Sequence, residues 1–484
     1  MTLGNRMSQI RVDAPLPDTP RNPDRSDHSG GPRWRSDHST PSCLARGRGS
    51  RLSNRTSQIR VDAPLPDTPS GLDSRPTNHV HSGPTNRGFF VRDVTAHRMT
   101  AEQTSGQPPG HWHHGDVDPD LTRAALACAR SVFGDAGLVS WTPLTGSTRS
   151  AVARMVLLTD AGSRTVIVKS TDGNARERAA LEVLTKAEVA GVPRLLAVSE
   201  DPPVLLLEDA GTGASVADRL LGDDRSAAAS AVEAWAVSVA RIQAATLSRG
   251  AAFRDRLIAL APDAEPEMTS AAFDGTVSGF AQLLPEIGAT FDDQATAEFY
   301  AIQDRLRVDP GAQAGPGALT PGDTCPDNNV GTPDGLVLID FEGADFRHVA
   351  WEAAYLSVPW PTCWCSWRMP AAVTAAAIER WRETLAPALD PEVAAGLDDA
   401  VRDATTCWSL FTAARLLPLA LGHASATQQP DRSPPAPLQL LQHRLSVAAA
   451  SADDGPLQRF ATATLAATRR EWGDQPLPLG PVWR

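Results

Sequence analysis

Apolar and polar positions follow three different patterns along this chain. Residues 1–98 show neither a helical nor a strand period, and they are rich in Pro, Gly, Ser, Asp and Arg, a composition that cannot bury a core. Short apolar runs separated by turn residues dominate up to residue 210, and helical spacing dominates after it. The pattern predicts a disordered tail over 1–98, a β-rich lobe over 99–210 and a helical lobe over 211–484.

The tail contains an internal repeat. Its segments Asn5–Pro20 and Asn54–Pro69 differ at one position, where Met7 is replaced by Thr56. Neither copy has an apolar face that could pack against the other, so the repeat does not predict a solenoid. We interpret it as a duplicated linker, or as translated non-coding sequence ahead of a start at Met99.

Five strands and two helices are predicted in the β-rich lobe. The strands are expected at Val139–Leu144, Ala151–Leu158, Thr165–Ser170, Leu195–Val198 and Val204–Leu207. A first helix, capped by Asp118 or Asp120, is expected to run through Phe133, and a second helix spans Ala175–Ala187. Together they predict a sheet of about five strands that one helix crosses.

The remaining sequence is mostly helical. Helices are expected at Ala227–Leu247, Ala371–Leu385, Glu392–Thr406 and Leu457–Glu471. The stretch Thr405–Leu421 carries Arg415 as its one charged residue and predicts a buried helix. Two short strands are expected near Gly317–Thr320 and at Gly335–Ile339. We therefore predict an α+β fold with a small β-rich lobe, a larger helical lobe and a cleft at their junction.

Composition narrows the class of protein. The net charge of −12 argues against nucleic acid as the main partner. No run of 18 apolar residues is free of charge, and the first residues lack the apolar segment of a secretory signal, so neither a membrane span nor secretion is expected. Six cysteines in 484 residues are too few for a disulfide framework and indicate a reducing, cytoplasmic compartment.

The strongest chemical signal lies in Pro321–Glu342, which reads PGDTCPDNNVGTPDGLVLIDFE. Asp323 precedes Asn328 by five residues, and Asp340 follows after a short predicted hairpin. Phosphoryl transfer needs a carboxylate that accepts or orients the proton of the attacking hydroxyl, and oxygen ligands that hold Mg²⁺ on the phosphates. Any one of these residues is an ordinary turn residue, but the three in this order predict Asp323 as the catalytic carboxylate and Asn328 and Asp340 as Mg²⁺ ligands.

Lysine is rare enough to be informative. The chain has only Lys169 and Lys186, and every other permanently basic side chain is arginine. Lys169 ends the predicted strand TVIVKS, where an ammonium can hold the α- and β-phosphates of a nucleotide. Glu177, in the first turns of the next helix, is favoured over Glu182 as its partner, and Lys186 is expected to be a surface residue.

A polar turn between the first two strands adds weaker support. In TGSTRS, the backbone amides at Gly146, Ser147 and Thr148 can approach a phosphate because glycine leaves the backbone open. One glycine in a polar turn usually only makes the turn, so this loop gains weight from its neighbours alone.

Several segments together resemble the aminoglycoside phosphotransferase-like enzymes, which are small-molecule kinases of the protein-kinase-like fold. The matching motifs are GDTCPDNN, LIDFE, VIVK, ARERAALEVL, GVPRLLAVSEDPPVLLLEDAG and SVARIQAAT, over about residues 118–360. The absence of Asp-Phe-Gly and Ala-Pro-Glu motifs argues against a protein kinase. The resemblance implies transfer of the ATP γ-phosphate to a hydroxyl of an aminoglycoside, another amino-sugar or another small metabolite.

The resemblance also implies roles for single residues. Asp323 would be the base, Asn328 and Asp340 would bind Mg²⁺, and Lys169 with Glu177 would contact the phosphates. Adenine would hydrogen-bond to the backbone around the three residues Glu208, Asp209 and Ala210.

Three positions depart from the family pattern. Pro321 replaces the histidine of the catalytic loop, Gln243 stands where many members have histidine, and Glu352 stands where aspartate is usual. The base and metal residues are intact, so we expect a competent enzyme in which Pro321 changes the support of the loop. Two alternatives remain, namely a nucleotide-binding protein that has lost catalysis and a non-enzymatic protein that acts through its tail.

Two further clusters are capable of binding metal. The pair Cys363 and Cys365 could bind zinc together with Cys325 or Cys407, although packing near the substrate mouth is the favoured interpretation. The stretch His111–His114 has suitable side chains, but we interpret it as a solvated segment at the edge of the tail.

Overall fold

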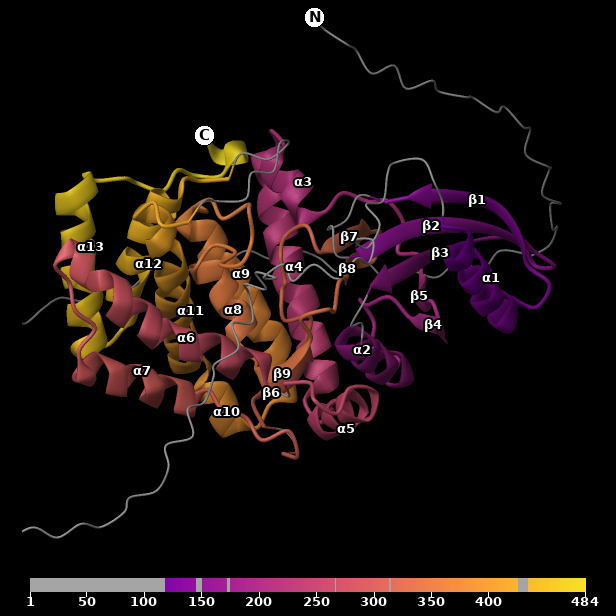
Figure 1. The fold of residues 1–484 in the computed structure, drawn as a ribbon, viewed down its shortest axis with the longest axis horizontal. Helices are drawn as coiled ribbons and strands as arrows, with labels where there is room; N and C mark the ends of the chain where they lie inside the picture. Colours follow the sequence, from indigo (N-terminus) through magenta and orange to yellow (C-terminus); the bar gives the residue numbers. More distant parts are fainter. Residues whose placement is uncertain (1–117, 145–149, 172–174, 266, 313–314, 425–433) are drawn as a thin grey trace, which may run out of the picture. The chain divides into compact units, whose positions relative to one another are not determined.

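A computed structural model describes residues 118–144, 150–171, 175–265, 267–312, 315–424 and 434–484 (Figure 1). The predicted tail over 1–98, the stretch His111–His114 and the turn residues Gly146, Ser147 and Thr148 lie outside these residues. The described part of the chain has the β-rich and helical lobes that the sequence predicted.

The β-rich lobe is built on one antiparallel sheet with the strand order β1-β2-β3-β5-β4. Its strands are β1 (Gly137–Pro143), β2 (Ser150–Thr159), β3 (Gly162–Thr171), β4 (Leu195–Glu200) and β5 (Pro203–Glu208). All five predicted strands are confirmed, as is the sheet that they form.

Helices cover both faces of this sheet. Helix α1 (Pro119–Phe133) begins at Asp118, whose side chain accepts hydrogen bonds from the amides of Asp120 and Leu121, so the cap is Asp118 rather than Asp120. It packs with Val168, whereas α2 (Ala175–Lys186) packs with Leu205 from the other face. Successive strand residues point to opposite faces, which is why the alternating apolar positions of β3 and β5 serve both helices.

The helical lobe contains more elements than the sequence indicated. Its helices are α3 (Val216–Leu221), α4 (Arg225–Thr246), α5 (Gly250–Leu260), α6 (Met268–Leu283), α7 (Asp293–Arg305), α8 (Ala350–Ser357), α9 (Ala371–Leu385), α10 (Pro391–Ala395), α11 (Leu397–Ala420), α12 (Pro437–Ser451) and α13 (Pro456–Trp472). Three short 3-10 helices are η1 (Leu284–Ile287), η2 (Ala386–Ala388) and η3 (Pro481–Trp483).

One predicted helix was wrong in its boundaries. The segment expected as Glu392–Thr406 is divided at Gly396 into α10 and α11, and α11 continues through the apolar stretch Thr405–Leu421 as far as Ala420. Residues on all sides of α11 are buried in this stretch, so no amphipathic period marks its continuity. Pro418 lies within the last turn of the helix.

Two small antiparallel pairs complete the lobe. Strand β6 (Gly317–Thr320) pairs with β9 (Asp345–His348), and β7 (Asn329–Thr332) forms a hairpin with β8 (Gly335–Leu338). The hairpin expected before Asp340 is thus confirmed. It contacts the β-rich lobe, because the Leu338 amide donates to the Gly191 carbonyl at 2.8 Å. Gly331 of the hairpin also pairs in an isolated bridge with Gly213, which follows the β-rich lobe directly.

Candidate active site

Asp323 lies on the loop that joins β6 to β7. The preceding Gly322 has φ of 79°, and an added Cβ there would overlap the carbonyl of Gly343. Only glycine fits this close approach of two backbone segments without strain. The glycine therefore allows the loop that carries Asp323 to lie against the segment that follows Asp340.

The Asp323 carboxylate is held by a threonine that the sequence motifs did not identify. Thr362 donates its hydroxyl to Oδ1 of Asp323 at 2.6 Å, and Tyr355 shares a hydrogen bond of 3.2 Å with the same threonine. Burial raises the pKa of Asp323, as do the negative charges of Asp340 and Asp327, and the Thr362 bond acts in the opposite direction. The sequence signal for Thr362 was its place beside Cys363.

Asn328 lies close to Asp323, and its contacts differ from those of the adjacent Asn329. Its Nδ2 donates to the Asp323 carbonyl at 3.0 Å, and its amide donates to the Cys325 carbonyl at the same distance. Asn329 is buried, accepts from the Val216 amide and donates to a carbonyl within the loop. Asn329 therefore fixes the loop, while the bond from Nδ2 of Asn328 leaves its Oδ1 as the oxygen that can face a cation.

Lys169 connects the two lobes. Its Nζ lies 2.9 Å from Oε1 of Glu177 and 2.6 Å from Oδ1 of Asp340. The expected pair with Glu177 is present, and the rival Glu182 instead binds Arg178 and Arg256. The structure thus brings a strand residue, a helix residue and the residue after the hairpin into one contact.

The charge of Lys169 and the backbone conformation of Asp340 are both consistent with their contact. Burial opposes the charge of Lys169, but the two carboxylates outweigh it and raise the pKa of the ammonium. Asp340 has φ of 66°, a conformation that non-glycine residues seldom adopt, and its side chain is 35% exposed while that of Lys169 is 8% exposed. The lysine is fixed, and Asp340 remains open to a further ligand.

The predicted adenine segment lies at the end of β5. Glu208 pairs with Val166 of β3, three residues before Lys169 on the same strand. The Asp209 carboxylate binds Arg154 in two hydrogen bonds of 2.7 and 3.0 Å and also accepts from the Gly211 amide. The side chain of Asp209 therefore holds this segment in place. Contact with adenine is left to the backbone of Glu208, Asp209 and Ala210.

Arginine and tyrosine support the loop in which Pro321 replaces histidine. Arg347 and Tyr355 donate to the Gly322 carbonyl at 3.1 and 3.3 Å. Arg347 is itself paired with Glu352, and both side chains are buried. Residues of β9 and α8 thus support this loop, and Glu352 holds Arg347, while the effect of Pro321 on the loop stays a prediction.

Gln243 takes a purely internal place. Its Nε2 donates to the Val349 carbonyl at 2.9 Å, and its Oε1 accepts from the Trp381 indole at 2.8 Å. It joins α4 to α9 and to the residue before α8, so this departure from the family pattern is met by packing between helices.

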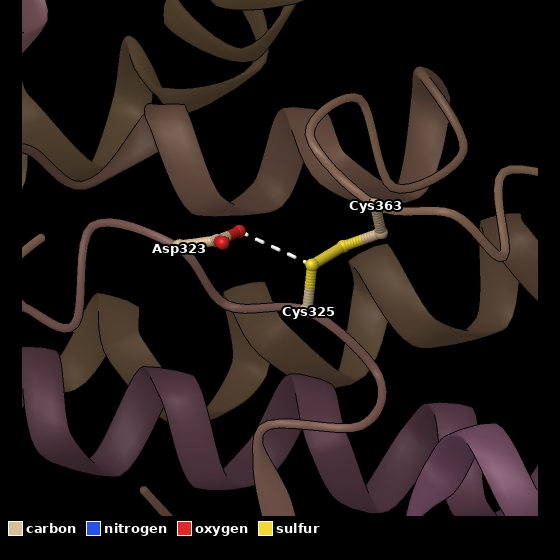
Figure 2. Close-up of side chains that lie close together, drawn as sticks. All are labelled: Asp323, Cys325 and Cys363. Carbon is tan, nitrogen blue, oxygen red and sulfur yellow. Dashed lines mark hydrogen bonds between the residues drawn. A yellow bond between two sulfur atoms is a disulfide. The ribbon is translucent and has the colours of Figure 1, made fainter. Parts of the chain in front are cut away.

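A disulfide that the sequence did not predict joins Cys325 to Cys363, with their Cα atoms 5.8 Å apart (Figure 2). Six cysteines were judged too few for a disulfide framework, and a count of cysteines says nothing about which two lie face to face. Cys365 and Cys407 are buried. Figure 2 shows the sulfur of Cys325 facing the Asp323 carboxylate.

The residues present fit a divalent cation that prefers oxygen. Asn328 and Asp340 offer an amide oxygen and a carboxylate, and negative Asp340 raises the pKa of Asp323 because two like charges are close. A cation at Asn328 and Asp340 would relieve that repulsion, and oxygen donors of this kind are those that Mg²⁺ takes.

No helix in the described residues is both long and apolar enough to cross a membrane.

The sequence and the structure were compared with known proteins. A family model described as the phosphotransferase enzyme family matches residues 148–389. None of the curated proteins compared matches the sequence.

Solved structures show weak likeness. An ethanolamine kinase of Plasmodium vivax is 13% identical, with 67% of this chain and 84% of that chain covered and a TM-score of 0.41. A choline/ethanolamine kinase family protein of Mesorhizobium loti is 14% identical, with 72% and 99% covered and a TM-score of 0.38. The structure of APH(2")-IIa with streptomycin and ATP is 12% identical, with 62% and 90% covered and a TM-score of 0.35. These scores are too low to add to the family match.

Proposed function

The chain belongs to the phosphotransferase enzyme family, and from that membership we propose that it transfers the γ-phosphate of ATP to a hydroxyl group of a small molecule. The observation that carries the proposal is the contact of Lys169 with both Glu177 and Asp340, beside a loop that presents Asp323 and Asn328 together. Phosphoryl transfer is achieved mainly by such positioning and by charge stabilisation.

Asp323 is the proposed base. As the acceptor oxygen bonds to the γ-phosphorus, its proton passes to the Asp323 carboxylate, and ADP leaves with the electrons of the broken bond. Burial raises the pKa of Asp323 above that of an ordinary aspartate, which brings its basicity closer to what a general base needs. Thr362 holds one carboxylate oxygen, so the other oxygen is left for the acceptor.

Lys169, Asn328 and Asp340 are proposed to hold the nucleotide. Lys169 would contact the α- and β-phosphates, and Asn328 and Asp340 would bind Mg²⁺. When bound, Mg²⁺ neutralises charge on the phosphates. Backbone groups of Glu208, Asp209 and Ala210 are proposed to contact adenine, and those of Gly146, Ser147 and Thr148 the phosphates.

The charges around the base support one class of acceptor. Asp327 and Asp340 both lie close enough to Asp323 to raise its pKa, and Arg347 acts in the opposite direction, so an acceptor hydroxyl would approach three carboxylates and one buried guanidinium. That favours an acceptor that carries ammonium groups, such as an aminoglycoside or another amino-sugar, and an uncharged metabolite would lack this attraction.

The alternative of a catalytically impaired protein rests on Pro321 in the loop of the base. Arg347 and Tyr355 both donate to the Gly322 carbonyl in that loop, and this support counts against the alternative.

The proposal is tested by measuring ADP release and phosphorylated product with a library of amino-sugars, aminoglycosides and other hydroxylated metabolites. Asp323→Asn keeps the size of the side chain and removes the proton acceptor, so turnover with any accepted substrate should fall by about 10²–10⁴-fold. The affinity for Mg-ATP should change little. Full turnover in Asp323→Asn would exclude Asp323 as the base, and Mg-ATP binding without any phosphorylated acceptor would favour the impaired protein.

A further inference from the structure

A second set of metal-ligating groups lies beside the proposed base. Sγ of Cys325 is 3.2 Å from Oδ1 of Asp323, and ligand atoms of Asp323, Cys325 and Cys363 all lie within 4.8 Å of one another (Figure 2). Among the described residues, no other set of three or more His, Cys, Asp or Glu side chains brings its ligand atoms this close together. It is distinct from Asn328 and Asp340, which offer oxygen alone.

The two cysteines have two chemical states. The structure shows the disulfide, which a phosphine can reduce. Phosphorus supplies the two electrons that break the S–S bond and takes up the oxygen of one water, and the two protons of that water convert the two sulfurs into thiols. A disulfide sulfur carries no hydrogen, so the Cys325 contact with Asp323 is a hydrogen bond only in the dithiol state. The geometry therefore also suits the reduced form.

We propose that the dithiol form binds one thiophilic divalent cation, with Zn²⁺ as the reference ion, through Cys325, Cys363 and Asp323. Zinc accepts two thiolates and a carboxylate, and a fourth position remains for water. In a tetrahedral site with zinc–sulfur bonds of about 2.3 Å and a zinc–oxygen bond of about 2.0–2.2 Å, the ligand atoms lie about 3.5–3.8 Å apart. The three ligand atoms lie within 4.8 Å of one another, and reduction lets side-chain rotations move the two sulfurs apart to that separation.

The backbone and neighbours hold these ligands in place. The Cys325 carbonyl accepts the Asn328 amide at 3.0 Å, and the Cys363 amide donates to the Trp360 carbonyl at 3.0 Å. Thr362 orients the carboxylate by its bond to Asp323, as partners of metal ligands commonly do. Cys325 is buried, whereas Asp323 and Cys363 are partly exposed, which provides a path for the ion.

The two neighbouring sites would therefore select different cations. Thiolates select zinc over magnesium, and the oxygen pair of Asn328 and Asp340 suits magnesium. A cation at the sulfur site occupies the Asp323 carboxylate and removes its capacity to accept a proton. This consequence for catalysis rests on the proposed function, whereas the binding of zinc does not.

The test is a metal titration of the full chain without nucleotide. The protein is reduced with a phosphine, exchanged into oxygen-free buffer and titrated with Zn²⁺ against a chromophoric chelator in excess Mg²⁺. Co²⁺ is titrated in parallel, because thiolate ligands give it a charge-transfer absorption that oxygen and nitrogen ligands do not. The comparison proteins are the oxidised chain, Cys363→Ser, and Cys128→Ala on α1 as a control remote from the site.

We expect the reduced protein to bind one more Zn²⁺ than the oxidised chain or Cys363→Ser, and Cys128→Ala to match the reduced protein. The difference between proteins is the readout because His111–His114 could bind zinc in all of them. Asp323→Asn should weaken the site by at least about tenfold. Equal zinc binding by the reduced protein and Cys363→Ser, or Co²⁺ without charge-transfer absorption, would overturn the proposal.

An activity measurement separates this inference from the proposed function. Once an acceptor is known, Zn²⁺ should lower turnover of the reduced protein in proportion to occupancy, and it should leave the rate of Cys363→Ser at its own zinc-free value. Thiolate-bound metal without any phosphotransfer would refute the proposed function only. Phosphotransfer by a reduced protein that takes up no additional zinc would refute this inference only.

Discussion

Lys169 is held by two carboxylates at once, and its replacement is the most direct test of the nucleotide site. Lys169→Ala should weaken Mg-ATP binding by about 10–100-fold, as expected for the loss of one charge-assisted hydrogen bond. Lys169→Arg should also bind less well, because a planar guanidinium cannot replace a compact ammonium between Glu177 and Asp340. Calorimetry measures both affinities.

The matched control is the only other lysine. Lys186 ends α2 and is exposed, so Lys186→Ala should bind Mg-ATP like the unchanged protein. Because Lys169→Ala leaves Glu177 buried beside a missing charge, thermal unfolding of each variant is compared first. Unchanged affinity in a folded Lys169→Ala would remove Lys169 from the nucleotide site.

Thr362 controls the basicity of Asp323 through a single hydrogen bond. Donation to a carboxylate stabilises its charged form and lowers its pKa, so Thr362→Val should raise it. With Asp323 as the proposed base, turnover would require its ionised form and would fall as pH drops through that pKa. The acidic limb of the kcat/KM profile should therefore move to higher pH, by roughly half a unit to one unit.

A structural effect alone would lower the rate at every pH without moving the limb. Thr384→Val, on the exposed side of α9, provides the comparison because its hydroxyl bonds only to a carbonyl of its own helix. An acidic limb at the same pH in Thr362→Val and the unchanged protein would exclude this role for Thr362.

Among the elements, β9 shows what periodicity misses. Its four residues, Asp345–His348, are polar except for Phe346, and all are buried. A strand of this kind has no alternation to detect, since Asp345, Arg347 and His348 form their hydrogen bonds to protein groups rather than to water. By contrast, β3 and β5 carry short apolar runs and were predicted, together with the helices that they contact.

The candidate site divides in the same way. Local sequence motifs were sufficient to predict four of the site residues, because the spacing within each motif indicates their chemistry. These residues are Asp323, Asn328, Asp340 and Lys169. Thr362 and the disulfide partners depend on a contact between loops 38 residues apart in sequence. Local patterns carry no information about such a contact.

Strand β9 also makes stability depend on pH through His348. Burial lowers the pKa of His348 to about 4, and its Nδ1 accepts the Ala350 amide. The unfolded chain binds this proton near pH 6.5, so the free energy of unfolding should fall as pH drops from about 6.5 to 4. The loss attributable to this histidine is on the order of 3 kcal/mol.

His348→Asn preserves an acceptor for the amide and removes the titration. Urea unfolding between pH 7 and pH 4 should show a smaller slope of stability with pH in the variant. His443, whose pKa burial lowers to about 3, contributes equally to both proteins and cancels in the difference. Identical slopes would mean that His348 does not titrate in this range.

At the scale of the whole molecule, the described elements supply a large core. Apolar side chains from α2, from the sheet and from the helices up to α13 form one cluster, and a second cluster lies between α1 and the sheet. We predict that a chain starting at Met99 folds and binds Mg-ATP with the affinity of the full chain. Calorimetry on the two proteins decides this, and an insoluble shorter chain or a weaker affinity would place the boundary elsewhere.

The position of Asp340 has a thermodynamic consequence. Its carboxylate neutralises Lys169 in the protein alone, so the ammonium is not fully available to an anion. A cation that draws Asp340 away frees Lys169, and an anion that engages Lys169 frees Asp340 in turn. The two ligands are therefore coupled, and each must raise the affinity of the other by the same factor. With the roles proposed above for Lys169 and Asp340, nucleotide and metal would each strengthen the binding of the other, even though each residue would contact only one of them.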